Sequence, residues 1–317
     1  MAKEAWSTHF TDDEKELGLQ DLGDVTKFQK LVHFTAKDEH RQNFALTRIN
    51  EIPNKAIEKN FPGVHCDIGG AYENEEEEYI DEIGTNTADG KYDSIYDYAE
   101  SFFHAKGLEA LQQDLITQHW YKTHELKIVR EKEGLQWIER GFENIKTPFY
   151  LKLTGTRVIR KEYSYIPLHF MEEFCRDTTM LQFFNRETVK DYPLKNSFLE
   201  KVKKSLHEYV FDDASEWEFV SDAQLLKEKQ EREEIDKERA IAKEIDEQQE
   251  IALPGISIID PNDEIVKIEL PEKKFNSLNT QKAIRKLRQE YLHWSSNRDW
   301  FGMQPTDDRK RIEYPKK

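Results

Sequence analysis

Two side chains that can transfer protons, His65 and Asp67, lie two residues apart inside a glycine-rich segment. The segment covers residues 61–72 and reads FPGVHCDIGGAY. Pro62 and Gly63 interrupt regular structure, and the two consecutive glycines near its end permit backbone angles that other residues resist. A histidine presented at the edge of such a turn suits general acid or base catalysis, because its pKa lies close to neutral pH. The segment is therefore the first candidate for a catalytic site.

A structural role for these side chains is the alternative. His65 can cap a loop through hydrogen bonds to the backbone, and Asp67 can form an Asx-type turn, as short polar side chains commonly do. Cys66, next to His65, raises a third interpretation, a cysteine–histidine nucleophile. Neighbouring residues of an extended segment point to opposite sides, which predicts poor geometry for that pair. The two cysteines, Cys66 and Cys175, form neither a disulfide framework nor a zinc-binding spacing.

A second charged cluster follows a short apolar run. Residues 31–34 (LVHF) read as a buried strand, and Asp38, Glu39, His40 and Arg41 come soon after it. Arg41 can pair locally with either acid. A solvated first turn of a helix, with the acids at its positive end, is the interpretation that the sequence favours.

Both clusters resemble elements of one protein family. Residues 61–72 resemble the F-P-G-V-H-x-D-x-G-G-x-Y signature of an uncharacterised α/β-hydrolase family that includes the type VI secretion phospholipase effectors of bacteria. Residues 33–44 (HFTAKDEHRQNF) are similar to that family's second recurrent element, H-x-x-A-x-D-E-x-R-x-x-F. The two elements occur in the family's order, so the resemblance implies a lipid-ester hydrolase.

The resemblance also implies roles for individual residues. His65 matches the signature histidine and would be the base of a catalytic triad, with Asp67 steadying its loop and Arg41 orienting neighbouring loops. His293 is the competing candidate for the base, because the catalytic histidine of an α/β-hydrolase usually follows the last strand, and residues 264–270 alternate as a strand would. Its surroundings, rich in tyrosine and tryptophan, also allow a structural role.

A hydrolase of this fold presents its nucleophile on a sharp turn, commonly within G-x-S-x-G, and that pattern does not occur in the sequence. In the family, the nucleophile and the acid that orients the base precede the region of resemblance. We therefore expect the chain to correspond to the C-terminal portion of a phospholipase-like serine hydrolase and to be inactive alone. Its expected partners are a phospholipid or other lipid ester and an N-terminal segment or a protein of the secretion machinery. A non-catalytic interaction module derived from such a hydrolase is the alternative.

The elements around these residues predict an α/β fold, with an incomplete α/β-hydrolase-like sheet followed by a largely helical region and a small antiparallel β unit. Four parts are expected: residues 1–122 as the hydrolase-like part, 123–220 as an accessory α+β region, 221–252 as a charged helical arm, and 253–317 as a strand, a helix and a polar tail. Apolar spacing predicts helices at 101–121 and 167–175, acids followed by a closing glycine predict one at 11–18, and basic helices are predicted at 195–210 and 281–291. Alternation predicts strands at 124–129 and 149–159, and a further strand is predicted at 56–60.

Composition excludes several classes of protein. The formal net charge is −16, with 63 acidic against 47 basic residues, and no basic patch suits nucleic acid. The sequence shows no signal peptide and no run long and apolar enough to span a membrane, so we expect synthesis in the cytoplasm and export by type VI secretion without a signal peptide. Residues 73–82 contain seven acids and read as a solvated loop, and neither a metal nor a cofactor is expected.

Overall fold

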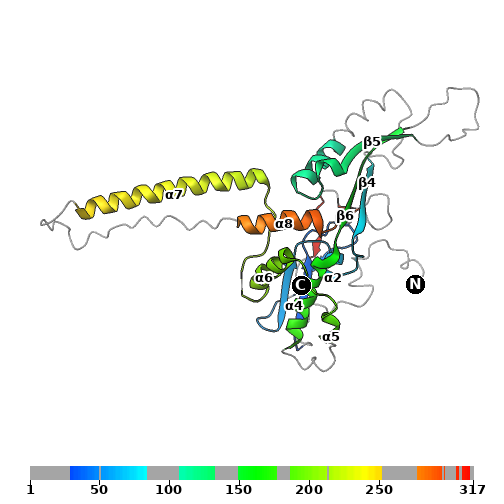
Figure 1. The fold of residues 1–317 in the computed structure, drawn as a ribbon, viewed down its shortest axis with the longest axis horizontal. Coiled ribbons are helices and arrows are strands. Elements are labelled where there is room, and N and C mark those ends of the chain that lie inside the picture. The colour runs from blue at the N-terminus through cyan, green and yellow to red at the C-terminus, as the bar shows by residue number, and fades with distance from the viewer. Residues whose placement is uncertain are drawn as a thin grey trace, which may run out of the picture. The chain divides into compact units, whose positions relative to one another are not determined.

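The computed structural model describes residues 29–49, 51–83, 107–132, 149–176, 186–212, 214–251, 277–294, 296, 305–306 and 309–314. Figure 1 shows the helices and strands of these parts. The predictions for residues 11–18 and 264–270 lie outside the described ranges.

Two parallel strands lie next to the candidate site. β1 (Leu31–Ala36) pairs with β3 (Ala56–Phe61) in the register Leu31↔Ala56. Their aromatic side chains pack on the following helix, because the Phe34 and Phe61 rings lie 4.8 Å apart and Phe61 lies 6.2 Å from Phe170 of α4. Phe61 and Phe170 are fully buried. Parallel strands covered by helices confirm the α/β class.

A second, antiparallel sheet has the strand order β4-β6-β5. Its members are β4 (Glu76–Ile83), β5 (Leu126–Lys132) and β6 (Phe149–Ile159). β5 and β6 confirm the predicted antiparallel unit. The prediction of an acidic loop at residues 73–82 is wrong for most of its length, because β4 pairs with β6 from Glu76↔Ile159 onward. Glu76 and Glu77 remain exposed, whereas the side chain of Glu78 is 9% exposed and pairs with Arg157.

The helices agree closely with the apolar periodicity. Residues 107–117 are helical, and η3 (Thr123–Glu125) and η4 (Lys161–Ser164) are short 3₁₀ turns. Three further helices are α4 (Tyr165–Arg176), α6 (Ser197–Phe211) and α8 (Leu278–Glu290), and α5 (Arg186–Val189) is a single turn. Each of these three helices has a buried apolar face, which is what residues spaced by three and four predict.

The C-terminal residues are not a plain polar tail. β7 (Glu313–Tyr314) pairs in parallel with β2 (Leu46–Thr47), and Arg41 forms an isolated bridge with Pro305. Charged side chains reinforce the pairing, since Arg48 donates to both carboxylate oxygens of Glu313 at 3.1 Å. The polar tail predicted at the end of residues 253–317 is therefore wrong at residues 313–314, because these polar residues pair as a short strand.

The chain divides into two compact units, Met1–Glu218 with Lys282–Lys317, and Phe219–Gln281. The second unit contains α7 (Asp222–Ile251), which confirms the predicted helix within 221–252. Nearly all side chains of α7 whose exposure is described are exposed or half-buried, in keeping with its charge. No described helix has the length and apolar character needed to cross a membrane.

Candidate active site

The glycine-rich segment forms a tight turn that ends in a short helix. β3 ends at Phe61, Gly63 adopts φ +108°, and α2 (His65–Gly69) begins two residues later. A Cβ atom at Gly63 would lie 2.9 Å from Asp67 Oδ2 and 3.0 Å from Leu292 Cδ2. Both the backbone angle and the space therefore require glycine here. The turn fixes His65 at the carboxyl end of a parallel strand, where α/β proteins commonly bind ligands.

His65 is held by a carboxylate from the preceding charged cluster. Its Nδ1 lies 2.7 Å from Glu39 Oε2, and Arg41 Nη2 lies 2.8 Å from the same nitrogen. Nδ1 cannot donate to Glu39 and accept from Arg41 at once, so protonation of the ring favours the contact with Glu39. The ring stacks on Phe44 with centroids 4.7 Å apart. The orientation of the imidazole is thus fixed on one edge and one face, while 42% of its side chain stays exposed.

Glu39 and Arg41 form a buried ion pair. Arg41 donates from Nε to Glu39 Oε1 at 2.8 Å and from Nη2 to Oε2 at 2.7 Å, and the two side chains are 1% and 4% exposed. Burial raises the pKa of Glu39, but the hydrogen bonds from Arg41 and His65 outweigh it and hold that pKa well below its usual range. The expected solvated helical turn is wrong, because residues 38–41 are not helical and three of their four side chains are buried.

The other edge of the His65 ring faces a thiol. Cys66 Sγ lies 3.1 Å from His65 Nε2. The predicted poor geometry of this pair is wrong, because residues 65 and 66 belong to α2 and not to an extended segment. The contact with Cys66 and then that with Glu39 raise the pKa of His65 to about 9, against the opposing effect of burial.

Asp67 and His293 make a second, separate pair. Asp67 Oδ1 lies 2.7 Å from His293 Nδ1, while Oδ2 accepts from the backbone N–H groups of Val64 at 2.9 Å and His293 at 3.1 Å. Both side chains are almost fully buried, and desolvation raises the pKa of Asp67 in spite of these bonds. The His293 ring stacks on Tyr72 at 3.5 Å, and its Nε2 has no hydrogen-bond partner among the described residues. Asp67 thus ties the start of α2 to the segment after α8.

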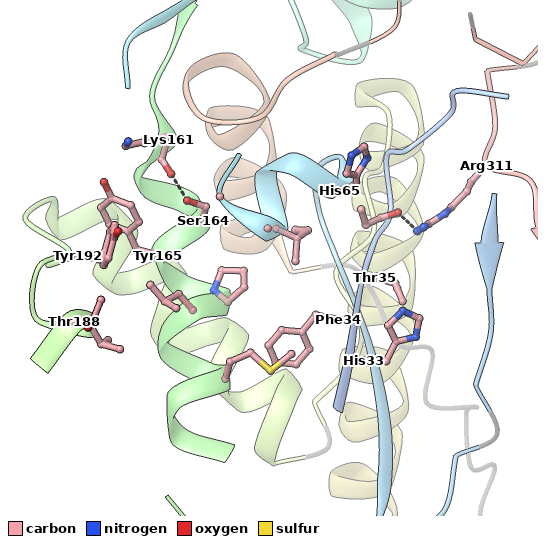
Figure 2. A pocket seen from close by; sticks show the side chains of 18 residues that line it. His33, Phe34, Thr35, His65, Lys161, Ser164, Tyr165, Thr188, Tyr192 and Arg311 are labelled. Carbon is pink, nitrogen blue, oxygen red and sulfur yellow. Dashed lines mark hydrogen bonds between the residues drawn. The ribbon is translucent and has the colours of Figure 1, made fainter. Parts of the chain in front are cut away.

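A cavity of about 860 Å³ opens beside His65 (Figure 2). Its walls come from β1, α2, the η4–α4 segment, α5 and Arg311. His65 lines this cavity, whereas His293 and Asp67 do not. The three predicted site residues therefore have different environments: His65 lines the cavity, whereas Asp67 and His293 are buried and do not line it.

The sequence singled out Glu39 and Arg41 as charged residues but did not predict that they contact His65. Both residues belong to the second family motif, and the spacing within that motif cannot reveal a contact between residues 26 positions apart. Among the described residues, no group of three or more histidine, cysteine or acidic side chains is placed to hold a metal ion.

Comparisons with known proteins are sparse. No protein-family profile matches the sequence, and no curated protein matches it. One similar solved chain is described as "Structure of the Tle1 effector bound to the VgrG spike from the Type 6 secretion system", with a TM-score of 0.49 and 16% sequence identity. The alignment covers 90% of the present chain and 50% of that chain, so the present chain spans about half its length.

Proposed function

We propose that the chain supplies the general base, and the carboxylate that orients it, to a site that hydrolyses lipid esters. The base is His65 and the carboxylate is Glu39. The observation that carries the proposal is the 2.7 Å contact between Glu39 Oε2 and His65 Nδ1 on a ring that borders a cavity. A carboxylate on Nδ1 selects the tautomer and stabilises the imidazolium that forms during acyl transfer.

The exposure of the two candidate histidines supports His65 over His293. The side chain of His65 is 42% exposed, whereas that of His293 is 3% exposed. A general base must come within hydrogen-bond reach of the proton that it abstracts, and a ring enclosed by Asp67 and Tyr72 offers little access. In this proposal Asp67 and His293 position the turn that carries the base.

The nucleophile in this proposal is a serine hydroxyl from a segment outside the described residues. His65 Nε2 would take the hydroxyl proton as the oxygen attacks the ester carbonyl, and would return it to the departing alcohol. Water would then cleave the acyl intermediate by the same route and release a fatty acid. His65 must be neutral to accept the first proton, so its raised pKa predicts faster hydrolysis as the pH rises toward about 9.

The partners follow from the resemblance of residues 33–44 and 61–72 to the phospholipase effectors. They are a phospholipid or other lipid ester, a segment that carries the nucleophile, and a protein of the type VI secretion machinery. Export by that machinery belongs to the same proposal.

The test is reconstitution. The chain is assayed alone and co-expressed with the polypeptide encoded upstream of it, using a soluble p-nitrophenyl ester and phospholipid vesicles. We expect no hydrolysis by the chain alone and hydrolysis by the pair. His65→Ala should lower kcat/KM by about 10³-fold or more, as for other triad members. The control is His124→Ala, an exposed histidine on η3.

His293→Ala separates the two candidate bases. Full activity in His65→Ala, together with loss in a folded His293→Ala, would make His293 the base. Hydrolysis by the chain alone that survives both substitutions would refute the proposal.

A non-catalytic interaction module is the second candidate. The observation in its favour is α7, a helix of 30 residues whose side chains are mostly charged and exposed where described. An inactive pair, with both polypeptides folded and associated, would favour this candidate.

A further inference from the structure

We infer that the cavity beside His65 binds an anionic amphiphile, with its carboxylate or phosphate head at the end of the cavity near His65 and its apolar chain between β1 and α4. The inference rests on the proposed function in that it names the ligand class of the same site. Binding needs no nucleophile, however, so it can be measured on the chain alone.

Where the structure describes it, the wall of the cavity carries basic side chains and no acidic ones. Acidic residues make up 63 of the 317 residues of the chain, yet none of the 18 described residues that line the cavity is acidic. The ionisable side chains with basic groups are His33, His65, Lys161 and Arg311. A basic cavity in a chain of net charge −16 attracts anions locally and repels cations.

Two of these cations form no ion pair with the described residues. Lys161 and Arg311 have no ion-pair partner among the residues that the structure describes, whereas His33 pairs with Glu58 at 3.0 Å. Arg311 donates from Nη1 to the carbonyl oxygen of Ala36, and its buried Nε has no partner within the described ranges. Desolvation lowers the pKa of Arg311, and the carboxylates of Glu39, Glu313 and Glu58, which form no ion pair with it, offset this effect only in part. A ligand anion in direct contact with Arg311 would offset the rest.

The distribution of polar and apolar groups along the cavity also supports the inference. Figure 2 shows Lys161, Ser164, His65 and Arg311 toward one end, and Phe34 further along β1 beside His33, whose ring pairs with Glu58. The larger aliphatic and phenyl side chains of the lining are those of Phe34, Ile68, Pro167, Leu168, Met171 and Val189. Because α4 runs away from Lys161 and Ser164, Leu168 and Met171 lie progressively further from the charged end. A ligand with an anionic head and an apolar chain matches this gradient.

The volume fits such a ligand. Small-molecule sites have volumes of about 300–1,000 Å³, and this cavity measures about 860 Å³. At neutral pH the raised pKa of His65 adds a third positive charge at the head end. The same chemistry has two sources, the fatty acid released by hydrolysis and the phosphate of a phospholipid head.

The experiment is displacement of a dansylated fatty acid from the full-length chain, followed by fluorescence. The competitors share a ten-carbon chain and differ only in the head: decanoate, decyl phosphate, decanol and decyltrimethylammonium, all below their micelle concentrations. We expect decanoate and decyl phosphate to displace the probe, with decanol weaker by about tenfold or more, as the loss of a charged hydrogen bond implies. Tighter decanoate binding points to the released fatty acid, and tighter decyl phosphate binding to the phospholipid head.

Two variants with matched controls locate the binding. Lys161→Ala should weaken the binding of decanoate and of decyl phosphate by about tenfold and leave the binding of decanol unchanged. The control Lys201→Ala, at an exposed position on α6, should leave the binding of all three ligands unchanged. Met171→Trp should weaken the binding of all three ligands, because the larger side chain fills the apolar end of the cavity. The control Val158→Trp, at a site 57% exposed on β6, should leave their binding unchanged. Circular dichroism and thermal unfolding identify folded variants.

Equal displacement by decyltrimethylammonium and decanoate, or folded Lys161→Ala and Met171→Trp variants with unchanged affinity, would overturn the inference. Anion binding by a chain whose reconstituted pair is inactive would refute the proposed function alone. Hydrolysis without anion binding would refute the inference alone.

Discussion

Glu39 Oε2 lies 2.7 Å from Nδ1 of His65, and the same carboxylate is held by two hydrogen bonds from Arg41. This contact joins the two sequence motifs into one site. A carboxylate of the chain itself thus contacts the ring, whereas the family resemblance implied an acid that precedes the region of resemblance.

Replacement of Glu39 should change the titration of His65. In Glu39→Gln the ring loses an anionic partner and keeps Arg41 Nη2 2.8 Å away, so the pKa of His65 should fall by about one unit or more. NMR titration of the histidine ring protons measures this. Glu58→Gln is the matched control, because Glu58 contacts His33 and should leave His65 unchanged. An unchanged His65 titration in Glu39→Gln would show that the contact is absent in solution.

Cys66 should have the larger effect on the same titration. The contact between Cys66 Sγ and His65 Nε2 is the first contributor to the raised pKa of His65. Cys66→Ala should therefore lower that pKa at least as far as Glu39→Gln does, whereas Cys175→Ala should not alter it. NMR titration again decides, and a pKa still near 9 in Cys66→Ala would contradict the role assigned to the thiol.

His65 should also make stability depend on pH. Its pKa is about 9 in the folded chain against the ordinary value of 6.5. The folded state thus binds the proton more tightly, and the resulting stability is complete below pH 6.5 and lost as the pH rises to about 9. Because the ring is partly exposed, we expect a loss of about 1 kcal/mol.

Urea denaturation at several pH values measures this loss. The midpoint of the native chain should fall more steeply between pH 6.5 and 9 than that of His65→Ala. Parallel curves would exclude His65 as the source of any pH dependence.

The Asp67–His293 pair should matter for stability. Asp67→Ala removes the acceptor of three hydrogen bonds and leaves a buried imidazole unpaired, so the free energy of unfolding should drop by about 3 kcal/mol or more. Asp191→Ala, at an exposed position, should stay within about 0.5 kcal/mol of the native chain. Equal stabilities of the two variants by urea denaturation would contradict the buried pair.

Local pattern predicted much of the fold. Alternation predicted β5 and β6, and an apolar stripe predicted α4. Basic helices were predicted at α6 and α8, and a run of nearly uninterrupted charge indicated the solvated helix α7. Local pattern failed at β4, where a run of glutamates suggested a loop although β6 supplies a strand to pair with. It also failed at β7, whose two residues carry no signal apart from the partner β2. In both cases a segment distant in sequence decides the structure.

The site was predictable in its residues but not in its contacts. His65, Asp67 and His293 were all candidates, yet sequence spacing cannot show that His293 meets Asp67 across 226 residues while His65 meets Glu39. Residues 38–41 were predicted to form a solvated helical turn, but three of their four side chains are buried. A run of charged residues usually lies at the surface, and only the positions of Arg288 and His65 show where these side chains are neutralised.

The hydrogen bonds that close the site also set an order for its formation during synthesis. Asp67 leaves the ribosome 226 residues before His293, and His40 leaves 256 residues before Ser296, to which its Nε2 is bonded at 2.8 Å. Throughout that interval the nascent chain carries a carboxylate and an imidazole that have not yet met their native partners. The turn at residues 61–70 therefore cannot reach its final geometry until residues 293–296 have been synthesised, and a chaperone that shields residues 38–67 would act during that interval.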